Sequence, residues 1–153
     1  MTRADETIYF YSVKEKPYGC FSNFSPHGFE ADGVRWPTSE HYFQAQKFAG
    51  TPHVEELRQA RSPMIAARMG RARSRPLRPD WNEVKDDIMR EAVRRKFRAN
   101  HDIRDTLLST GDAELVEKTT RDYYWGCGTD GTGKNMLGKI LMEVREELRG
   151  GGD

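Results

Sequence analysis

The sequence lacks the features of a disulfide-rich protein, of a membrane protein and of a protein that binds polyanions through its net charge. Its two cysteines, Cys20 and Cys127, lie far apart in 153 residues, and two cysteines do not make the disulfide framework of a small secreted domain. No apolar stretch approaches the roughly 20 residues that span a bilayer, and the charged N-terminal residues contain no signal-peptide core. The 25 Lys and Arg residues are balanced by 24 Asp and Glu residues, so no global field attracts nucleic acid. We therefore expect a cytoplasmic protein with reduced thiols.

The length and the hydrophobic pattern indicate one domain of mixed secondary structure. A chain of this size can bury a single core, and we expect one domain over 8–149, a flexible N-terminus at 1–7 and a disordered tail at 150–153. Aromatic and alternating runs predict strands, and apolar residues at helical spacing predict helices. The expected strands lie at 8–11, 29–36 (a hairpin turning at Asp32-Gly33) and 114–119, and the expected helices at 38–48, 52–61, 63–70, 80–97, 102–109 and 136–148.

The helix over 38–48 is the leading candidate for a functional site. Pro37 presets a helical backbone, and Thr38 or Ser39 can accept a hydrogen bond from a first-turn amide. At 3.6 residues per turn, one face of this helix carries an acid, an amide and an amine. That mixture, with aromatic rings nearby, is typical neither of a core helix nor of a solvated one. The residues of this face are Glu40, Phe43 or Gln44, and Lys47.

Two other segments allow both a structural and a functional interpretation. Asn23, between two phenylalanines, either caps a turn or faces a ligand, because an amide both donates and accepts hydrogen bonds. The most basic segment is either a solvated charge run or a source of phosphate ligands. Its arginines are Arg68, Arg71, Arg73, Arg75 and Arg78.

The stretch 121–135 places a glycine-rich loop before the last helix. Four glycines fall within the eight residues 126–133, and a flexible loop at a helix N-terminus suits an anion. The order is not that of a P-loop, because Asn135 stands where a magnesium-binding hydroxyl is required. Asn135 is better placed as the helix N-cap or as a substrate contact. Asp122 and Trp125 precede the loop with no evident structural duty. Upstream, Asp80 and Glu83 match a capping box for the longest helix.

Several of these motifs together resemble one family. They are Phe21–Phe24, Trp36–Phe48, Ala67–Arg71, and Tyr124–Gly126 through Asn135–Gly138. In order and spacing they are similar to the YbiA family, also called the NADAR superfamily, from Tyr9 to about Leu148. The resemblance implies an α+β fold, mostly helical and single-domain around a small antiparallel sheet. It also implies hydrolysis of the N-glycosidic bond between a ribosyl C1 and an exocyclic amine.

Two substrate classes follow from the resemblance, and a third interpretation is not catalytic. The first class is the phosphoribosylamino-pyrimidines that begin riboflavin synthesis, which a near-neutral domain without a basic arm favours. The second is ADP-ribosyl-guanine, so that nucleic acid would be a partner only as a modified substrate. The third interpretation is a module that binds ADP-ribose or a nucleotide. No cofactor or metal is expected, and water is the only second substrate required.

The resemblance also suggests roles for individual residues. Glu40 and Lys47 match the functional glutamate and lysine of the family. A carboxylate near C1 stabilises developing positive charge or activates water. Lys47 either donates a proton to the departing amine or, with a lowered pKa, attacks C1. The structural alternative for this pair is a helix-surface ion pair. His41 points away from the Glu40 face.

The remaining residues are expected to bind substrate. Trp36 and Trp125 stack on the base or belong to the core. Asn23, Gln44 and Asn135 read ring edges or ribose hydroxyls. Arg68 or Arg71 holds a phosphate through its fork of donors. Asp122 orients a substrate hydroxyl or Lys47. Gly126 belongs to the glycine-rich loop and is expected to bind substrate there.

Overall fold

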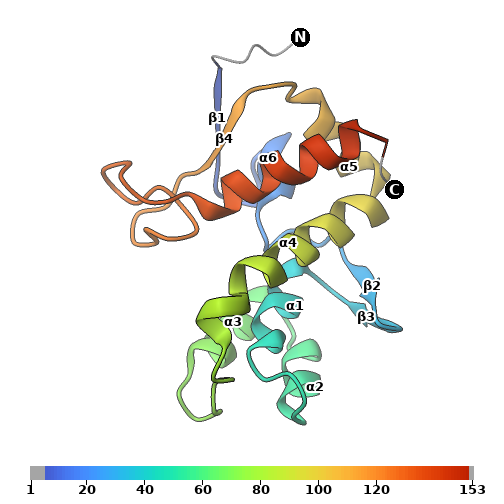
Figure 1. The fold of residues 1–153 in the computed structure, drawn as a ribbon, viewed down its shortest axis with the longest axis vertical. Helices are drawn as coiled ribbons and strands as arrows, with labels where there is room; N and C mark the ends of the chain where they lie inside the picture. The colour runs from blue at the N-terminus through green and yellow to red at the C-terminus, as the bar shows by residue number, and fades with distance from the viewer. Residues whose placement is uncertain (1–5, 152–153) are drawn as a thin grey trace. The chain divides into compact units, whose positions relative to one another are not determined.

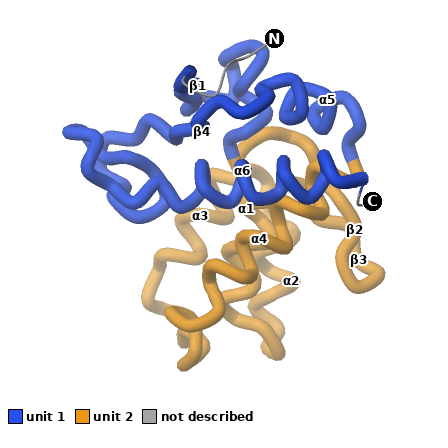
Figure 2. The backbone as a smooth tube through the Cα atoms, turned by 45° about the horizontal axis from the view of Figure 1, so that its top comes forward, with its two compact units in different colours: residues 1–22, 100–153 blue, residues 23–99 orange. Residues whose placement is uncertain are grey.

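The computed structural model describes residues 6–151. The chain forms two compact units, one of residues 1–22 and 100–153 and one of residues 23–99 (Figure 2). The expected flexible N-terminus and tail lie largely outside the described residues, although Thr7 already belongs to a strand and Gly150 follows the last helix. Among residues 6–151, no helix has the length and apolarity needed to cross a membrane.

The first unit is built on two parallel strands. The strands β1 (Thr7–Phe10) and β4 (Glu114–Glu117) pair in register, with Ile8 opposite Leu115. The expectation of a purely antiparallel sheet is therefore wrong here, because this pairing joins segments about a hundred residues apart. The other elements of the unit are the 3-10 helix η1 (Tyr18–Phe21) and the helices α5 (His101–Ser109) and α6 (Met136–Arg149) (Figure 1).

The helix α6 lies unusually close to β4. A Cβ atom added at Gly138 would come within 2.1 Å of the Leu115 carbonyl oxygen, so only glycine allows this approach. The apolar face of α6 is buried, and Arg145 is buried with it. Its Nη1 donates to Thr110 Oγ1 and to the Ala113 carbonyl, each at 2.9 Å. These bonds tie α6 to the segment between α5 and β4.

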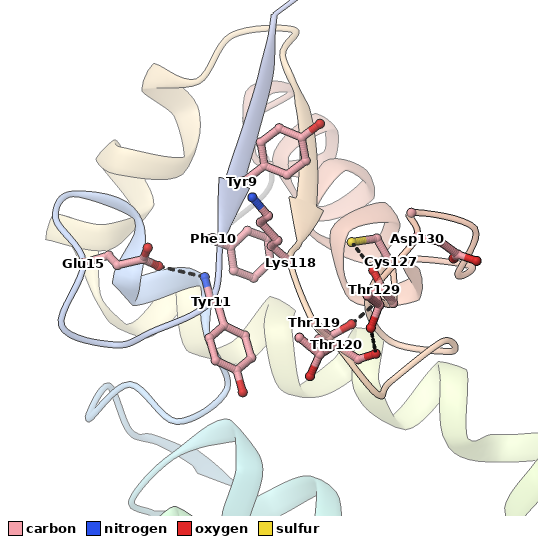
Figure 3. Close-up of a pocket in the computed structure, with 12 residues that line it drawn as sticks. Tyr9, Phe10, Tyr11, Glu15, Lys118, Thr119, Thr120, Cys127, Thr129 and Asp130 are labelled. Atoms are coloured by element: carbon pink, nitrogen blue, oxygen red, sulfur yellow. Dashed lines mark hydrogen bonds between the residues drawn. The ribbon is translucent and has the colours of Figure 1, made fainter.

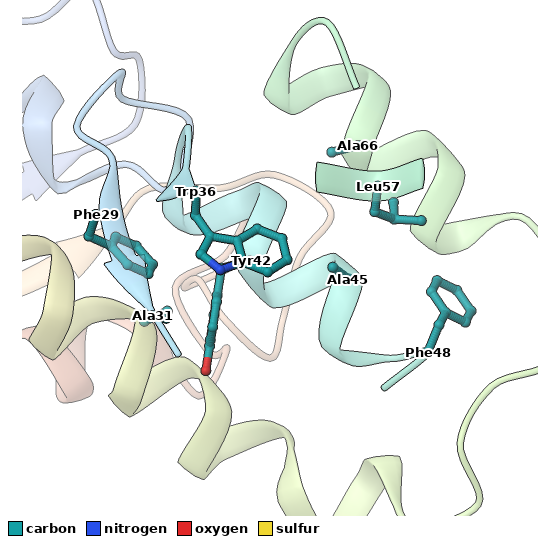
Figure 4. Packing of buried hydrophobic residues seen from close by; sticks show 9 residues of the cluster. Phe29, Ala31, Trp36, Tyr42, Ala45, Phe48, Leu57 and Ala66 are labelled. Atoms are coloured by element: carbon teal, nitrogen blue, oxygen red, sulfur yellow. The ribbon is translucent and has the colours of Figure 1, made fainter. Parts of the chain in front are cut away.

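The second unit combines a hairpin with four helices. The strands β2 (Phe29–Ala31) and β3 (Val34–Trp36) are antiparallel, as predicted, and their turn uses positive φ at Asp32 and Gly33. The helices are α1 (Ser39–Gln46), α2 (His53–Arg58), α3 (Pro63–Arg71) and α4 (Trp81–Ala99). Figure 4 shows the core of this unit, in which rings from the hairpin meet Tyr42 of α1. The α+β class is confirmed, with two small sheets in place of one.

The starts of the helices show which capping signals in the sequence correctly predicted a cap. Thr38 Oγ1 accepts from the His41 amide at 3.1 Å, and Ser62 Oγ accepts from the Ile65 amide at 3.1 Å. Of the two caps that the sequence allowed for α1, Thr38 is therefore the one that forms, and Ser62 caps α3 in the same way. The capping box at Asp80 is wrong, because both carboxylate oxygens of Asp80 accept from Arg78, at 2.6 and 3.0 Å. A nearby guanidinium, which is charged, outcompetes a neutral amide for that carboxylate.

Candidate functional site

The helix α1 is buried on all sides although its sequence is polar. Helices α2, α3 and α4 all pack against it, and every residue from Ser39 to Ala45 is buried. Buried polar side chains need hydrogen-bond partners, so the contacts of α1 decide which groups support the fold and which remain available for chemistry.

Asn23 holds the beginning of α1. Its carbonyl accepts from the Glu40 amide at 3.1 Å. Its Oδ1 accepts from Ser39 Oγ at 2.9 Å, and its Nδ2 lies 3.5 Å from Met89 Sδ. The side chain is partly buried, and its oxygen is bonded to a hydroxyl of α1. A ligand contact by Asn23 stays a prediction.

His41 has structural contacts at both ring nitrogens. Nδ1 lies 2.8 Å from Thr38 Oγ1, and Nε2 lies 3.0 Å from the Ala60 carbonyl. Since a carbonyl only accepts, Nε2 carries the proton and Nδ1 accepts from the threonine hydroxyl. Burial lowers the pKa of His41, partly opposed by the bond to Ala60. The neutral ring therefore fixes the first turn of α1 to the end of α2.

Glu40 and Gln44 form the predicted polar face. Gln44 Nε2 donates to Glu40 Oε2 at 2.8 Å, and both side chains are buried. Gln44 Oε1 is buried without a hydrogen-bond partner among the described residues. An amide hydrogen bond to a carboxylate favours the ionised form of the acid. The arrangement presents a fixed carboxylate in a largely dry environment.

Lys47 ends the same face at the C-cap of α1. Its Nζ donates to the Gly70 carbonyl at 3.3 Å and lies 5.8 Å from the centre of the Trp81 ring. Desolvation lowers the pKa of Lys47; Glu40 acts in the opposite direction, and Arg71 lowers it further. Hydrogen bonding, burial and a neighbouring cation thus distinguish Lys47 from a solvated lysine. An ordinary surface ion pair with Glu40 does not describe these contacts.

The structure adds two residues to the site that the sequence did not indicate. Trp81 has the helical spacing of a core residue, and nothing in that spacing shows that its ring meets a lysine. Gly70 follows a small apolar helical face and looks like a helix terminator. Their roles depend on contacts between α1, α3 and α4, which local sequence does not encode.

The arginine run divides into paired and unpaired members. Arg75 pairs with Glu56 at 3.0 Å and Arg78 with Asp80 at 2.6 Å. Arg68 and Arg71 are exposed and form no ion pair within the described part of the chain. Arg68 Nη2 instead lies 3.5 Å from Met64 Sδ. Arg68, Arg71 and Arg73 are therefore the arginines of this run whose charge no carboxylate of the described chain neutralises.

Trp36 belongs to the core. Its side chain is 4% exposed, and its ring meets Tyr42 edge-on at 5.3 Å between centroids (Figure 4). A ring without an open face cannot stack on a base, so the core alternative is correct and the stacking prediction for Trp36 is wrong.

In the other unit, the glycine-rich loop satisfies its own polar groups. Asp122 Oδ1 accepts from the amides of Tyr124 and Trp125, at 2.9 and 2.8 Å. Asn135 Nδ2 donates to the Leu115 carbonyl, and its Oδ1 accepts from the Glu117 amide, each at 2.9 Å. Asn135 therefore extends β4 with a side-chain amide. Ligand contacts by Asp122 and Asn135 stay predictions, but the geometry of each is that of a structural residue.

The anion site predicted at the start of α6 is wrong. The amides of Asn135, Met136 and Leu137 donate to the carbonyls of Gly126, Tyr124 and Trp125 at 2.9–3.0 Å. These donors are the ones an anion would need. Trp125 is partly exposed and meets Tyr124 edge-on at 4.9 Å, so its stacking role stays a prediction. Gly126 is buried and packs on Thr119, leaving no room for a Cβ atom.

A hollow of about 650 Å³ lies within the first unit, between β1 and the loop (Figure 3). Tyr9 and Tyr11 line it and are 56% and 59% exposed. Lys118 Nζ lies 5.5 Å from the centre of the Tyr9 ring. None of the predicted site residues lines this hollow, so it does not bring them together.

Comparisons with known proteins place these features in a family. The chain is 54% identical over 144 residues to N-glycosidase YbiA of Escherichia coli (strain K12), covering 94% of this chain and 89% of the relative. The NMR structure of E. coli YbiA matches with a TM-score of 0.88 at 53% identity, covering 97% of this chain and 87% of that one. A riboflavin biosynthesis protein of Vibrio vulnificus is 43% identical over 145 residues, covering 95% of this chain but 39% of that longer protein.

The family-level match spans nearly the whole described chain. The profile of the NADAR domain matches residues 9–149, which include α1 with Glu40 and Lys47 as well as the glycine-rich loop. The resemblance seen in the motifs is therefore confirmed, and the chain belongs to the NADAR domain family.

Proposed function

We propose that this protein is an N-glycosidase that hydrolyses the bond between a ribosyl C1 and an exocyclic amine. The observation that carries the proposal is the face of α1. Its buried Glu40 receives a hydrogen bond from Gln44, and its Lys47 has a pKa lowered chiefly by desolvation. The 54% identity to a protein named N-glycosidase supports the same activity.

In the proposed reaction, Lys47 is the nucleophile and Glu40 handles protons. The sugar ring opens, the neutral Nζ of Lys47 adds to C1, and the C1–N bond to the base breaks. Nζ loses two protons as the imine forms, of which the ring oxygen takes one and the departing amine the other. Water then adds to C1 of the lysine imine and gives a proton to the carboxylate of Glu40. Glu40 returns this proton to Nζ, the hydroxyl on C1 supplies the second, and the C1–Nζ bond breaks, releasing the sugar aldehyde and the free lysine. The route needs an unprotonated amine, and the lowered pKa of Lys47 raises the fraction of that form.

The hydrogen bond to Gly70 is compatible with this role. Nζ donates to the Gly70 carbonyl, and a neutral amine can make that bond while keeping its lone pair for C1. Desolvation of Lys47 disfavours the ammonium form. These contacts support attack by the amine over proton donation by an ammonium.

We further propose that the substrate carries a phosphate and that its base is a pyrimidine. Arg68 and Arg71 are exposed without carboxylate partners in the described chain, and the fork of donors of arginine fits a phosphate. The Vibrio vulnificus relative is named for riboflavin biosynthesis, which supports the phosphoribosylamino-pyrimidines of that pathway. The alternative substrate, ADP-ribosyl-guanine in DNA or RNA, also offers phosphate groups.

The test is an assay of released sugar with the wild-type protein on two substrates. These are the pyrimidine ribosylamine phosphate and an oligonucleotide bearing ADP-ribosyl-guanine. Turnover of the first alone supports the proposal, and turnover of the oligonucleotide alone moves the protein to nucleic-acid repair. Release of sugar from neither leaves a binding module and contradicts the proposal.

The phosphate contact has its own control. We expect Arg71→Ser to raise KM about tenfold for the phosphorylated pyrimidine substrate, the size of one charge-assisted hydrogen bond, and to leave KM for the dephosphorylated substrate unchanged. Arg75→Ser is the matched variant, because Arg75 is already paired with Glu56. An equal effect of Arg71→Ser on both substrates would exclude this arginine as the phosphate ligand.

A further inference from the structure

Gly70 contacts Lys47 directly and is linked to Glu40 through Gln44. It is the penultimate residue of α3. Its carbonyl accepts from Lys47 Nζ at 3.3 Å. A Cβ atom added at Gly70 would lie 2.0 Å from Gln44 Oε1, 2.8 Å from its Cδ and 3.0 Å from its Cβ. Gln44 in turn donates to Glu40.

The position is not explained by backbone conformation. Gly70 lies inside a helix, with no positive φ, and glycine is a poorer helix former than alanine. The close approach of Gln44 is a sufficient reason for glycine here. Because the clash reaches the Cβ of Gln44 as well as its amide, rotation of the amide alone would not relieve it.

The amide of Gln44 is held in one orientation by this packing. Its Oε1 is buried against Gly70 with no hydrogen-bond partner among the described residues. A buried acceptor without a partner is disfavoured. The unpaired Oε1 is retained here because the opposite orientation would turn Nε2 away from the Glu40 carboxylate. In the observed orientation Nε2 donates to that carboxylate and favours its ionised form.

The carbonyl of Gly70 fixes the second group. It is among the last four carbonyls of α3, which have no partner within the helix. Lys47 Nζ uses this free acceptor, and Trp81 lies on the amine at 5.8 Å. One backbone position on α3 therefore sets the location of the lysine amine and, through Gln44, that of the carboxylate.

We infer that Gly70 is a positioning residue that aligns Glu40 and Lys47 for catalysis through its missing side chain and its carbonyl. The inference rests on the proposed function. We assign Gly70 no contact with substrate. It links α3 to both reacting groups, so a single methyl group at this position disturbs the pair.

The experiment compares Gly70→Ala with Gln44→Ala, the double variant and Gly150→Ala. We expect Gly70→Ala to lower kcat about 100-fold, the cost of a displacement near 1 Å. KM should change less than about threefold, because the three atoms nearest to the added Cβ belong to Gln44 and not to the arginines proposed to hold the phosphate. The acidic limb of the kcat/KM profile should move to higher pH, because the carboxylate loses its amide donor. Gly150→Ala should change nothing, since its Cβ would meet no atom closer than 3.5 Å.

The double variant separates packing from catalysis. Gln44→Ala removes the contacts with Oε1 and Cδ at 2.0 and 2.8 Å and leaves the one with the Cβ atom at 3.0 Å. Gly70→Ala/Gln44→Ala should therefore melt higher than Gly70→Ala, but it lacks the donor and should stay slow with the shifted pH limb. If Gly70→Ala does not fold, Gln44→Ala alone must show the slow rate and the shifted limb.

Three outcomes overturn the inference. Wild-type kcat and pH profile in folded Gly70→Ala would do so, as would a wild-type profile in Gln44→Ala, or a double variant that melts no higher than Gly70→Ala. An inactive wild-type protein would instead refute the proposed function, and the inference would fail with it. Activity in the wild type with no effect of Gly70→Ala would refute the inference alone.

Discussion

The face of α1 and the glycine-rich loop before α6 both contain predicted site residues, but they differ in how their polar groups are used. In the loop, Asp122 and Asn135 bond the surrounding backbone. On α1, Lys47 has a lowered pKa, and Gln44 keeps a buried oxygen without a partner in the described chain.

This difference distinguishes residues that stabilise the fold from residues that are available for catalysis. A polar group whose donors and acceptors are all engaged by the protein contributes mainly to stability and order. A desolvated amine beside a buried carboxylate costs stability and is retained for another reason, since perturbed groups cluster at functional sites. We therefore expect substitutions on α1 to reduce activity and substitutions in the loop to reduce stability.

The largest effect is expected at Lys47. Lys47→Met should lower kcat at least ~10³-fold, because it removes the nucleophile. Lys47→Arg should do nearly the same, since a guanidinium keeps the charge but cannot attack C1. Single-turnover assays measure both. In the wild type, borohydride added during turnover should attach the sugar to the peptide that contains Lys47, as found by mass spectrometry.

Lys47→Arg also tests the alternative role. An arginine that retains a tenth or more of the wild-type rate would show that Lys47 acts through its charge or a proton. The Schiff-base step would then be wrong, while the assignment of Lys47 to the site would stand.

A smaller effect, on folding and not on chemistry, is expected at Asn135. Asn135→Ala should lower the free energy of unfolding by about 2–4 kcal/mol, because two buried backbone groups of β4 lose their partners. Urea unfolding measures it. Asn135→Gly is the matched control: it keeps the positive φ of 54° accessible and isolates the hydrogen bonds from backbone strain.

Activity per folded molecule decides what Asn135 does. If it stays within about threefold of the wild type in both variants, a span that costs under 1 kcal/mol, the residue is structural. A large rise in KM at unchanged stability would restore Asn135 as a substrate ligand and would remove the contrast between loop and helix.

The smallest effect is a pH dependence of stability from His41. Its pKa is lowered in the folded state, so below the unfolded value of about 6.5 the unfolded chain binds a proton that the folded chain does not. Stability should therefore fall as the pH decreases from about 6.5 toward the folded pKa. His41→Gln should flatten that part of the curve in thermal unfolding. An unchanged slope would assign the dependence to other groups.

The parts of the fold that sequence could predict are those fixed within a few residues. Thr38 and Ser62 cap their helices, and Asp32-Gly33 turns its hairpin, because each needs only neighbouring backbone. The capping box at Asp80 failed for a reason just as local: Arg78, two residues earlier, occupies the carboxylate. Competition between local partners is not visible in a motif.

The parts that sequence could not predict depend on distant segments. The parallel pairing of β1 with β4 joins segments about a hundred residues apart. The loop carbonyls that occupy the α6 amides lie about ten residues before them. In the site, helical spacing placed Glu40, Gln44 and Lys47 on one face, but the contact with Gly70 comes from α3. Family motifs predict which residues act but do not show the contacts that position them.

The central claim is that chemistry resides on α1, and Glu40→Gln tests it most directly. Glutamine keeps the size of Glu40 and an oxygen that can accept from Gln44, so the melting temperature should remain that of the wild type. With the ribosylamine substrate that the wild type hydrolyses, released sugar should show kcat/KM lowered at least ~10²-fold, the usual loss of one preorganised electrostatic group. A folded Glu40→Gln variant with wild-type kcat/KM would contradict the account.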